Sequence, residues 1–250
     1  MDERPATRLY LTAGLAEGAE ISLDDAAAHR LRTVLRLAPG AAVAGFNPRD
    51  GEFLCRVAEL RRGGGRLAVE RRLRAPEPES DLWLVFAPIK RARLDWLVEK
   101  ATELGVSALV PVWTERTQPE RLNLERLSAH AAAAAEQSER LSVPELRAPE
   151  RLDRILADWP ADRRLLVCDE TGGGIPIATI GATVENAGPA ALLVGPEGGF
   201  TERELDALGK LTFVIRVGLG PRVLRAETAA IAALAVFQAA AGDWRRARAG

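Results

Sequence analysis

The pattern of hydrophobic and polar residues changes after about residue 75. Before it, short alternating or apolar runs and one stretch with helical spacing are separated by turn residues at 48–51 and 63–65. Short strands between such turns are typical of a small β-barrel or curled sheet. We expect strands at 8–11, 41–46, 52–60 and 66–73, and a helix at 24–35.

From residue 82 onward, apolar runs alternate with longer amphipathic segments. Fully apolar runs are expected of strands that are covered on both faces, and apolar residues at helical spacing indicate helices. We expect strands at 82–87, 107–113, 164–168, 190–194 and 213–217, and helices at 91–104, 124–140, 201–208 and 226–241. This alternation predicts an α/β domain with a parallel sheet and helices on both faces.

The segment 76–81 carries two prolines among acidic residues and nothing that a core would bury. Such a composition predicts a linker. We therefore expect an N-terminal domain at 1–75, a linker at 76–81 and a second domain at 82–250.

The 250 residues are 47% hydrophobic and 28% charged, which is ordinary for a globular protein. No apolar run approaches the roughly 20 residues of a membrane span, and the charged N-terminus lacks a signal core, so we expect a cytoplasmic protein. The net charge is −1, but residues 1–75 hold thirteen arginines and ten acidic residues. That local excess of positive charge is compatible with a nucleic-acid partner.

The cysteines and histidines form no metal-binding pattern. Cys55 and Cys168 lie far apart, and only His29 and His130 accompany them, so no zinc spacing occurs. We expect two unpaired, buried thiols and no metal site.

One glycine-rich turn follows the apolar strand 190–194. Gly195 and Pro196 end the strand, and Gly198 and Gly199 precede a helix that Thr201 and Glu204 would cap as a capping box. Glycines at the carboxyl end of a parallel strand allow close approach of a ligand to the backbone. A purely structural strand-to-helix turn is the alternative interpretation.

A second such turn follows the strand 213–217. Its glycines are Gly218 and Gly220, with Val223 where a dinucleotide-binding motif would have its third glycine, and the chain has no Gly-Lys-Ser/Thr of a P-loop. Arg225 and Glu227 then precede a purely apolar helix. The alternative interpretation is that these two side chains only pair at the surface and cap the helix.

Together these turns resemble the signature of the bacterial 16S ribosomal RNA uridine-N3 methyltransferases, a family of the SPOUT class of knotted enzymes. The similarity extends over nearly the whole chain. The other matching segments are Lys100–Gly105, Glu115–Arg116, Glu136–Arg140, Val143–Pro144, and His29 followed by Val34–Arg36.

The resemblance implies a C-terminal domain with a trefoil knot, a rare exception to the usual topology rules, and a small PUA-like N-terminal barrel. It implies S-adenosyl-L-methionine as the cofactor, bound in the knot, and a homodimer formed through the same region. It also implies that the partner is 16S ribosomal RNA of the small subunit. The implied cofactor contacts are Leu193, Gly195, Pro196, Glu197, Gly198, Leu219, Gly220, Val223, Leu224 and Thr228.

Methyl transfer from a sulfonium needs mainly an in-line alignment of nucleophile, methyl group and sulfur. Uracil N3 carries a proton at neutral pH, so the enzyme must favour the anion or remove the proton during attack. We expect Arg225 to stabilise the negative charge that spreads onto O2 and O4. Glu227 or Glu197 is the candidate base.

The front helix is the candidate RNA-binding element. At helical spacing, His29, Arg32 and Arg36 share one face, and Leu31, Val34 and Leu35 lie on another. A basic face of this kind suits contact with phosphates, although an ordinary solvated face is the alternative. Arg8 and Lys90 are further candidates for RNA binding.

Two other functions remain open at this point. One is a SPOUT methyltransferase that acts on the ribose 2′-oxygen, although the segment 88–93 lacks the Asn that such relatives usually carry. The other is a non-catalytic ribosomal RNA-binding assembly factor, which intact glycine turns disfavour.

Overall fold

The computed structural model describes residues 3–118, 121–183 and 188–245. The chain forms two compact units: Met1–Pro78 with Ala135–Val143, and Glu79–Ala134 with Pro144–Gly250. None of the helices in the described ranges is long and apolar enough to cross a membrane.

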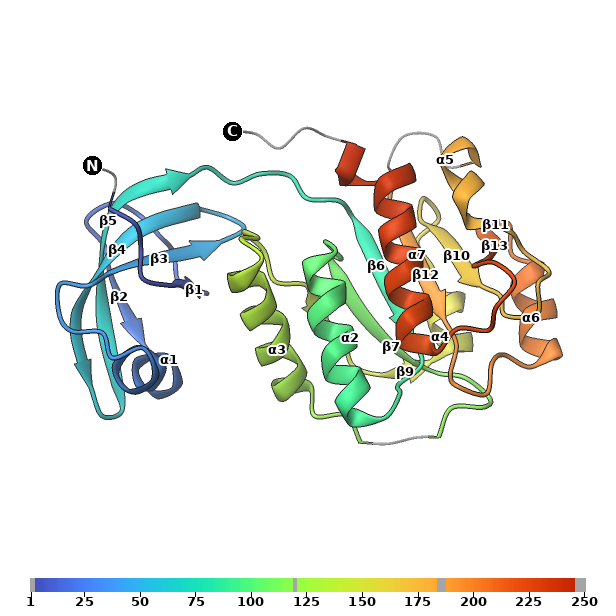
Figure 1. Cartoon of the computed structure of the whole chain (residues 1–250), viewed down its shortest axis with the longest axis horizontal. Helices are drawn as coiled ribbons and strands as arrows, with labels where there is room; N and C mark the ends of the chain where they lie inside the picture. Colours follow the sequence, from blue (N-terminus) through green and yellow to red (C-terminus); the bar gives the residue numbers. More distant parts are fainter. Residues whose placement is uncertain (1–2, 119–120, 184–187, 246–250) are drawn as a thin grey trace. The chain divides into compact units, whose positions relative to one another are not determined.

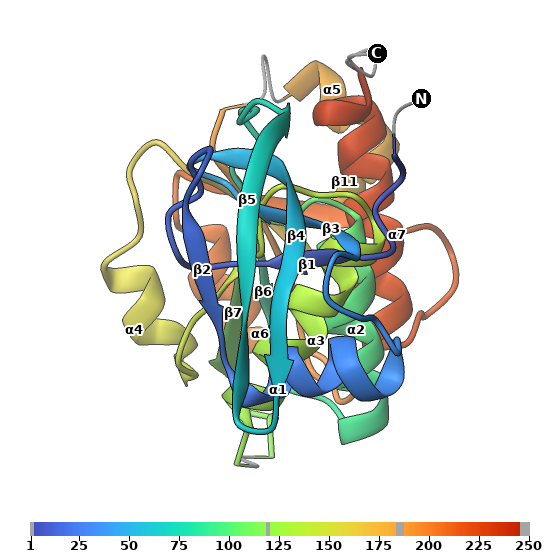
Figure 2. The same cartoon turned by 90° about the vertical axis from the view of Figure 1, so that its left-hand side faces the viewer.

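The first unit is built on a five-stranded sheet. Its elements are β1 (Arg8–Tyr10), β2 (Glu20–Leu23), α1 (Asp25–His29), η1 (Arg30–Val34), β3 (Ala42–Asn47), β4 (Gly51–Arg61) and β5 (Gly64–Arg74). The strand order is β1-β3-β4-β5-β2, with β1 parallel to β3 and all other neighbours antiparallel. Figure 2 shows β2, β5 and β4 side by side, with α1 near their lower ends. The expected strands are present, and β2 is one that the sequence did not predict.

The expected helix at 24–35 is an α-helix only as far as His29. Asp24 caps it by accepting a hydrogen bond from the backbone N–H of Ala27, and the five residues Arg30–Val34 then form a turn of π-helix. A π-turn inserts an extra residue and rotates everything after it. Leu31 is therefore fully buried, whereas Val34 is 66% exposed. The expected apolar face of Leu31, Val34 and Leu35 is wrong for this reason.

Residues 135–143, which the sequence pattern assigned to the second domain, pack with the first unit. Phe46 of β3 forms a small core cluster with Ala135 and Leu141. The periodicity of a helix shows which face is apolar but does not show which partner covers that face. This is why the sequence missed the assignment.

The second unit is built on an eight-stranded sheet. Its strands are β6 (Leu82–Phe86), β7 (Ala108–Trp113), β8 (Glu145–Leu146), β9 (Glu150–Arg151), β10 (Arg164–Cys168), β11 (Ile175–Pro176), β12 (Ala190–Val194) and β13 (Val214–Gly218). The order is β11-β13-β10-β12-β6-β7-β8, and β9 also pairs with β7. Every neighbouring pair is parallel, which confirms the predicted α/β fold with a parallel sheet.

Helices connect these strands. They are α2 (Arg91–Glu103), α3 (Leu124–Gln137), α4 (Leu152–Ala157), η2 (Ile177–Thr179), α5 (Ile180–Thr183), α6 (Glu202–Gly209), α7 (Ala226–Ala240) and η3 (Asp243–Arg245). Leu152 of α4 and Leu205 of α6 join a core cluster with Val85, Val167 and Leu193 of the sheet. Helices α2 and α7 pack against each other and lie in front of the sheet in Figure 1.

The strand order brings three carboxyl ends together. β10 lies between β12 and β13, although β10 precedes both in the sequence. The segments that leave Cys168, Val194 and Gly218 therefore emerge side by side at one edge of the sheet. Open parallel sheets bind their ligands at this kind of position.

Candidate functional site

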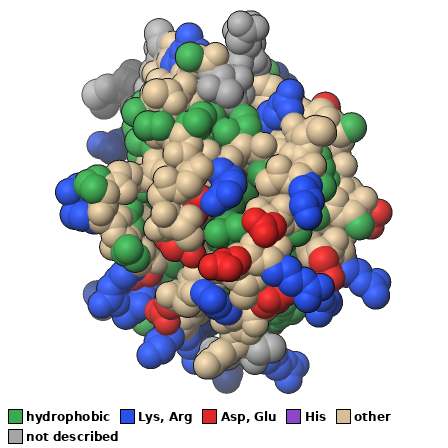
Figure 3. Space-filling model, turned by 90° about the vertical axis from the view of Figure 1, so that its right-hand side faces the viewer, with side chains coloured by type: hydrophobic (Ala, Val, Ile, Leu, Met, Phe, Trp, Pro, Cys, Tyr) green, Lys and Arg blue, Asp and Glu red, His purple; other side chains and the backbone are tan. Residues whose placement is uncertain are grey.

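A cavity of about 540 Å³ lies at the carboxyl ends of β10, β12 and β13. Its volume is within the range of about 300–1,000 Å³ that is typical of small-molecule sites. Its walls come from Arg93 at the start of α2 and from most of the residues in the segments 168–172, 194–199 and 218–229. On the face drawn in Figure 3, hydrophobic, acidic and basic side chains are intermingled.

The turn after β12 requires glycine at two positions. A Cβ on Gly195 would lie 2.9 Å from the ring of Phe200, and a Cβ on Gly199 would lie 1.9 Å from Oε1 of Glu170. Gly199 also has φ +68°, a left-handed conformation that other residues adopt at a cost. The following helix begins with the predicted capping box of Thr201 and Glu204.

Two charged side chains hold this turn from neighbouring segments. Nη1 of Arg116 donates to the carbonyl oxygens of Gly198 (2.8 Å) and Phe200 (3.3 Å). Oε1 of Glu170 accepts from the backbone N–H of Phe200 at 3.0 Å. The turn is thus fixed by the loops that follow β7 and β10, which preorganises its backbone for a ligand.

The loop after β10 is fixed by a buried carboxylate. Oδ2 of Asp169 accepts from Nε (2.9 Å) and Nη2 (2.5 Å) of Arg216, and Oδ1 accepts from the backbone N–H and hydroxyl of Thr171. Burial alone would raise the pKa of Asp169, but these hydrogen bonds outweigh burial and hold the pKa below its ordinary value. Asp169 is therefore a structural anion of this wall.

Arg93 links the two glycine turns. Its Nη1 donates to Oε1 of Glu197 at 2.6 Å, and its Nε lies 3.5 Å from Oε1 of Glu227. Oε2 of Glu227 is buried with no partner among the described atoms. The alternative that Arg225 and Glu227 simply pair at the surface is not what the structure shows, since Glu227 pairs with Arg93.

Most of the predicted cofactor residues line the cavity. They are Gly195, Pro196, Glu197, Leu219, Gly220, Val223 and Leu224. Gly198 and Thr228 are not part of the lining, and Leu193 is a fully buried core residue of β12. Successive side chains of a strand point to opposite faces of the sheet, and the side chain of Leu193 packs in the hydrophobic core and not in the cavity.

The two predicted catalytic residues lie in different surroundings. Arg225 is exposed, lines the cavity and is the N-cap residue of α7. Glu227 lies in the first turn of α7, outside the cavity lining, with a side chain only 12% exposed. Glu197 does line the cavity.

Sequence reasoning did not assign several of the lining residues to the site. They are Arg93, Cys168, Asp169, Glu170, Thr171, Gly172, Val194, Gly199, Gly218, Pro221, Arg222, Ala226 and Ala229. One available signal was polar Asp169 directly after the apolar strand at 164–168. Both cysteines are free and buried, as predicted, and burial raises the pKa of Cys168 to about 12.

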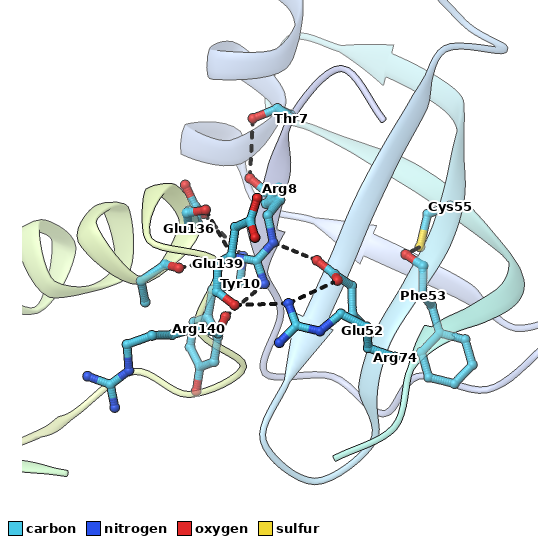
Figure 4. Close-up of polar contacts among 11 residues, drawn as sticks. Thr7, Arg8, Tyr10, Glu52, Phe53, Cys55, Arg74, Glu136, Glu139 and Arg140 are labelled. Atoms are coloured by element: carbon cyan, nitrogen blue, oxygen red, sulfur yellow. Dashed lines mark hydrogen bonds and ion pairs between the residues drawn. The ribbon is translucent and has the colours of Figure 1, made fainter. Parts of the chain in front are cut away.

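Arg8, a predicted RNA-binding residue, is occupied within the first unit (Figure 4). Its Nε donates to Oε1 of Glu52 at 2.5 Å, and its Nη atoms donate to the carbonyl oxygens of Ala135, Glu136 and Arg140 at 2.7–3.0 Å. The side chain is 15% exposed. With these donors engaged, Arg8 stabilises the packing of residues 135–140 on the first sheet.

The other predicted RNA-binding side chains are accessible. His29, Arg36 and Lys90 are exposed, and Arg32 is half-buried. In the described ranges, none of the four takes part in an ion pair. Arg36 has φ +55°, an uncommon conformation for a residue with a Cβ.

No cluster of three or more His, Cys, Asp or Glu that could hold a metal ion occurs in the described part of the chain. The cavity instead offers the backbone groups of two glycine turns and apolar walls. These features suit an organic ligand with polar groups.

Comparison with known proteins identifies the family. Residues 76–238 match a family of RNA methyltransferase domains. A ribosomal RNA small subunit methyltransferase E of Rickettsia conorii is 34% identical over 229 residues, which cover 91% of this chain and 93% of the relative. The chain belongs to this methyltransferase family. The corresponding protein of Synechocystis is 32% identical over 88% of this chain and 73% of its own.

Solved structures of the family have the same fold. The small-subunit methyltransferase E of Neisseria gonorrhoeae, described as bound to S-adenosyl methionine, has a TM-score of 0.83 with 27% identity, covering 95% of this chain and 99% of its own. A putative methyltransferase of Legionella pneumophila, described as a complex with the cofactor, has a TM-score of 0.82 with 30% identity, covering 96% and 100%. Both are described with the cofactor that the resemblance of the motifs implies for this chain.

Proposed function

We propose that this protein transfers a methyl group from S-adenosyl-L-methionine to N3 of a uridine in the decoding region of 16S ribosomal RNA. The observation that carries the proposal is the cavity at the ends of β10, β12 and β13, which two glycine turns line. Family membership and the two cofactor-bound relatives support it. The base and the position of the methyl group rest on the resemblance of the motifs.

The cavity fits the cofactor in size and in chemistry. Its volume of about 540 Å³ is adequate for a nucleoside with an amino-acid tail, and the rigid turns at Gly195–Gly199 and Gly218–Gly220 can present backbone groups to that ligand. We propose Gly195, Pro196, Glu197, Leu219, Gly220, Val223 and Leu224 as contacts. Leu193, Gly198 and Thr228 remain proposed contacts that would act through their backbones or after a local rearrangement.

When bound, the cofactor supplies a methyl group on a positively charged sulfur. The protein has to orient the uracil so that N3 faces that methyl group in line with the sulfur. We assign to exposed Arg225 the stabilisation of the negative charge on the uracil oxygens as the N3 proton leaves.

Glu197 is the better placed of the two candidate bases, because it lines the cavity and Glu227 does not. Glu227 holds Arg93, and Arg93 in turn holds Glu197. We therefore propose Glu197 as the group that accepts the N3 proton. Glu227 would be a positioning residue that acts through Arg93.

We propose that His29, Arg32, Arg36 and Lys90 contact the RNA, since they are accessible and lack ion pairs in the described structure. The first 75 residues would form the RNA-binding domain as a PUA-like barrel, joined by the linker 76–81 to a knotted domain at 82–250, of which residues 135–143 pack with the first unit. The knot rests on the resemblance of the motifs, and the strand order β13-β10-β12 is compatible with it. Cytoplasmic action follows from the proposed ribosomal substrate.

We also propose a homodimer that forms through α7. Ile231, Ala232, Ala235 and Val236 recur at helical spacing, and all four are only partly buried in the single chain. Val223, next to this helix, is 83% exposed. Light scattering of the purified protein should give twice the chain mass of 26.9 kDa, and a monomer at micromolar concentration would contradict the dimer.

The deciding experiment is incubation of the purified protein with labelled cofactor and small subunits that lack the modification. The RNA is then digested to nucleosides and analysed by mass. Label in N3-methyluridine supports the proposal. Label on a ribose 2′-oxygen would contradict it and would identify the protein as a ribose 2′-O-methyltransferase. Cofactor binding without transfer to any RNA would favour an assembly factor.

A further inference from the structure

A second cavity, of about 160 Å³, opens where α2 and α3 begin, two helices that lie side by side in Figure 1. Three arginines are among its lining residues: Arg91, Arg121 and Arg126. The apolar side chains of Ile89 and Leu94 form part of the remaining wall. All of these residues belong to the second unit, and none belongs to the cofactor cavity.

The positive charge in this cavity is only partly neutralised. Nη1 of Arg126 donates to Oδ2 of Asp95, and His130 lies 3.8 Å from the same oxygen. Nε of Arg126 is buried without a hydrogen-bond partner in the described structure. Arg91 and Arg121 are exposed, and neither forms an ion pair with any described residue. Of these three arginines, only Arg126 is paired with a carboxylate of the described residues, that of Asp95.

The two helix ends add to the positive potential. Helix α2 begins after Lys90 without a side-chain cap, and its first turn has no acidic residue but contains Arg91 and Arg93. Basic residues at the positive end of a helix dipole are unfavourable unless an anion is present. Helix α3 begins beside Asn123, which caps it by accepting from the N–H of Arg126 and also lines the cavity.

We propose that this cavity binds a phosphodiester group of the RNA substrate. A volume of about 160 Å³ holds roughly five waters at ~30 Å³ each, enough for a phosphate group with some hydration. Guanidinium groups bind phosphate oxygens through paired hydrogen bonds, which fixes the direction of the backbone as well as its position.

The location gives the phosphate site a role in catalysis. The first turn of α2 contributes Arg91 to this cavity and Arg93 to the cofactor cavity. An RNA phosphate held at Arg91 would therefore be held by the same rigid turn that positions Glu197. This site would set the position of the target nucleotide, and it rests on the proposed function only for the identity of the RNA.

The test compares the variant R91A/R121A with the control R154A/R203A. Arg154 and Arg203 are exposed arginines of the same unit that line neither cavity, so both variants lose two positive charges. Binding of a labelled single-stranded fragment of small-subunit ribosomal RNA is measured by anisotropy over a range of salt concentrations. Methyl transfer to small subunits and cofactor binding are measured in parallel.

We expect R91A/R121A to weaken RNA binding about tenfold and to flatten the slope of log affinity against log salt by about 0.7 for each lost phosphate contact. The KM for RNA should rise while the affinity for S-adenosyl-L-methionine stays unchanged. A slope and a KM equal to those of the control would overturn the inference.

Two further outcomes separate this inference from the proposed function. If inorganic phosphate raises the melting temperature of the wild type but not of R91A/R121A, and the RNA slope is equal in both, the site binds free phosphate and the RNA assignment is wrong. If the wild type transfers no methyl group but the variant loses RNA affinity and slope, the proposed activity fails and the phosphate site stands.

Discussion

Replacing Gly199 by alanine should damage the candidate cofactor site through two separate effects. The residue has φ +68°, and its added Cβ would lie 1.9 Å from Oε1 of Glu170. The methyl group must therefore displace the carboxylate that accepts the N–H of Phe200. Both effects act on the turn that lines the cavity.

The size of each effect can be worked out. A left-handed conformation costs an alanine about 1–2 kcal/mol relative to glycine. Loss of a hydrogen bond to a charged group costs about 1.5–3 kcal/mol. The sum is about 2.5–5 kcal/mol if the turn keeps its present shape. If the turn relaxes instead, the cost appears as a loss of cofactor affinity of about a hundredfold for each ~3 kcal/mol.

The assays are urea unfolding for stability and calorimetry for cofactor affinity, applied to Gly199→Ala and to the control Gly209→Ala. Gly209 ends α6, and a Cβ there meets no atom within 4 Å. The control should be neutral or slightly stabilising. Equal behaviour of the two variants in both assays would refute the argument that the turn is sterically determined.

Other perturbations test the remaining parts of the structure. Arg225→Ala should lower kcat by about a hundredfold or more and leave cofactor affinity unchanged in calorimetry. An unchanged kcat would show that Arg225 takes no part in the methyl transfer. Arg8→Ala should lower the free energy of unfolding by about 3 kcal/mol, because the partners of Arg8 are largely buried. The salt dependence of RNA binding should not change, and an altered salt dependence would show that Arg8 contacts RNA. Asp169 has a lowered pKa, so its contribution to stability is present above the ordinary aspartate pKa of 3.8 and is lost as the pH falls through the folded-state value. Asp169→Asn should therefore flatten the loss of stability in acid unfolding curves, and unchanged curves would contradict this. Reversing Arg32 and Arg36 to Glu should weaken RNA binding and reduce its salt dependence, and an unchanged slope would exclude that surface.

The strands and helices that carry the site were largely predictable from the sequence. Strands at 164–168 and 190–194 have the predicted bounds, and Thr201 caps α6 as its capping box indicated. These features depend on residues a few positions apart, so their physical causes are visible in a short stretch of sequence. The glycine turns at Gly195 and Gly220 were visible for the same reason.

The partners of those turns were not predictable in this way. Arg93 reaches Glu197 across 104 positions in the sequence, and Glu170 reaches Phe200 across 30. No residue near Arg93 in the sequence indicates that its guanidinium would pair with Glu197. Arg8 likewise donates to the carbonyl oxygens of Ala135 and Glu136, which are 127 and 128 positions away in the sequence.

By itself, the sequence determined the alternation of strands and helices, the glycine turns and, through its motifs, the family. Only the tertiary structure decided that β10 lies between β12 and β13, that Val34 turns outward after a π-helix, and that three arginines share one cavity. The physical reason is the separation in sequence over which each kind of interaction acts. Backbone propensity and capping act over a few residues, whereas ion pairs, cavities and strand order depend on which distant segments the hydrophobic core brings together.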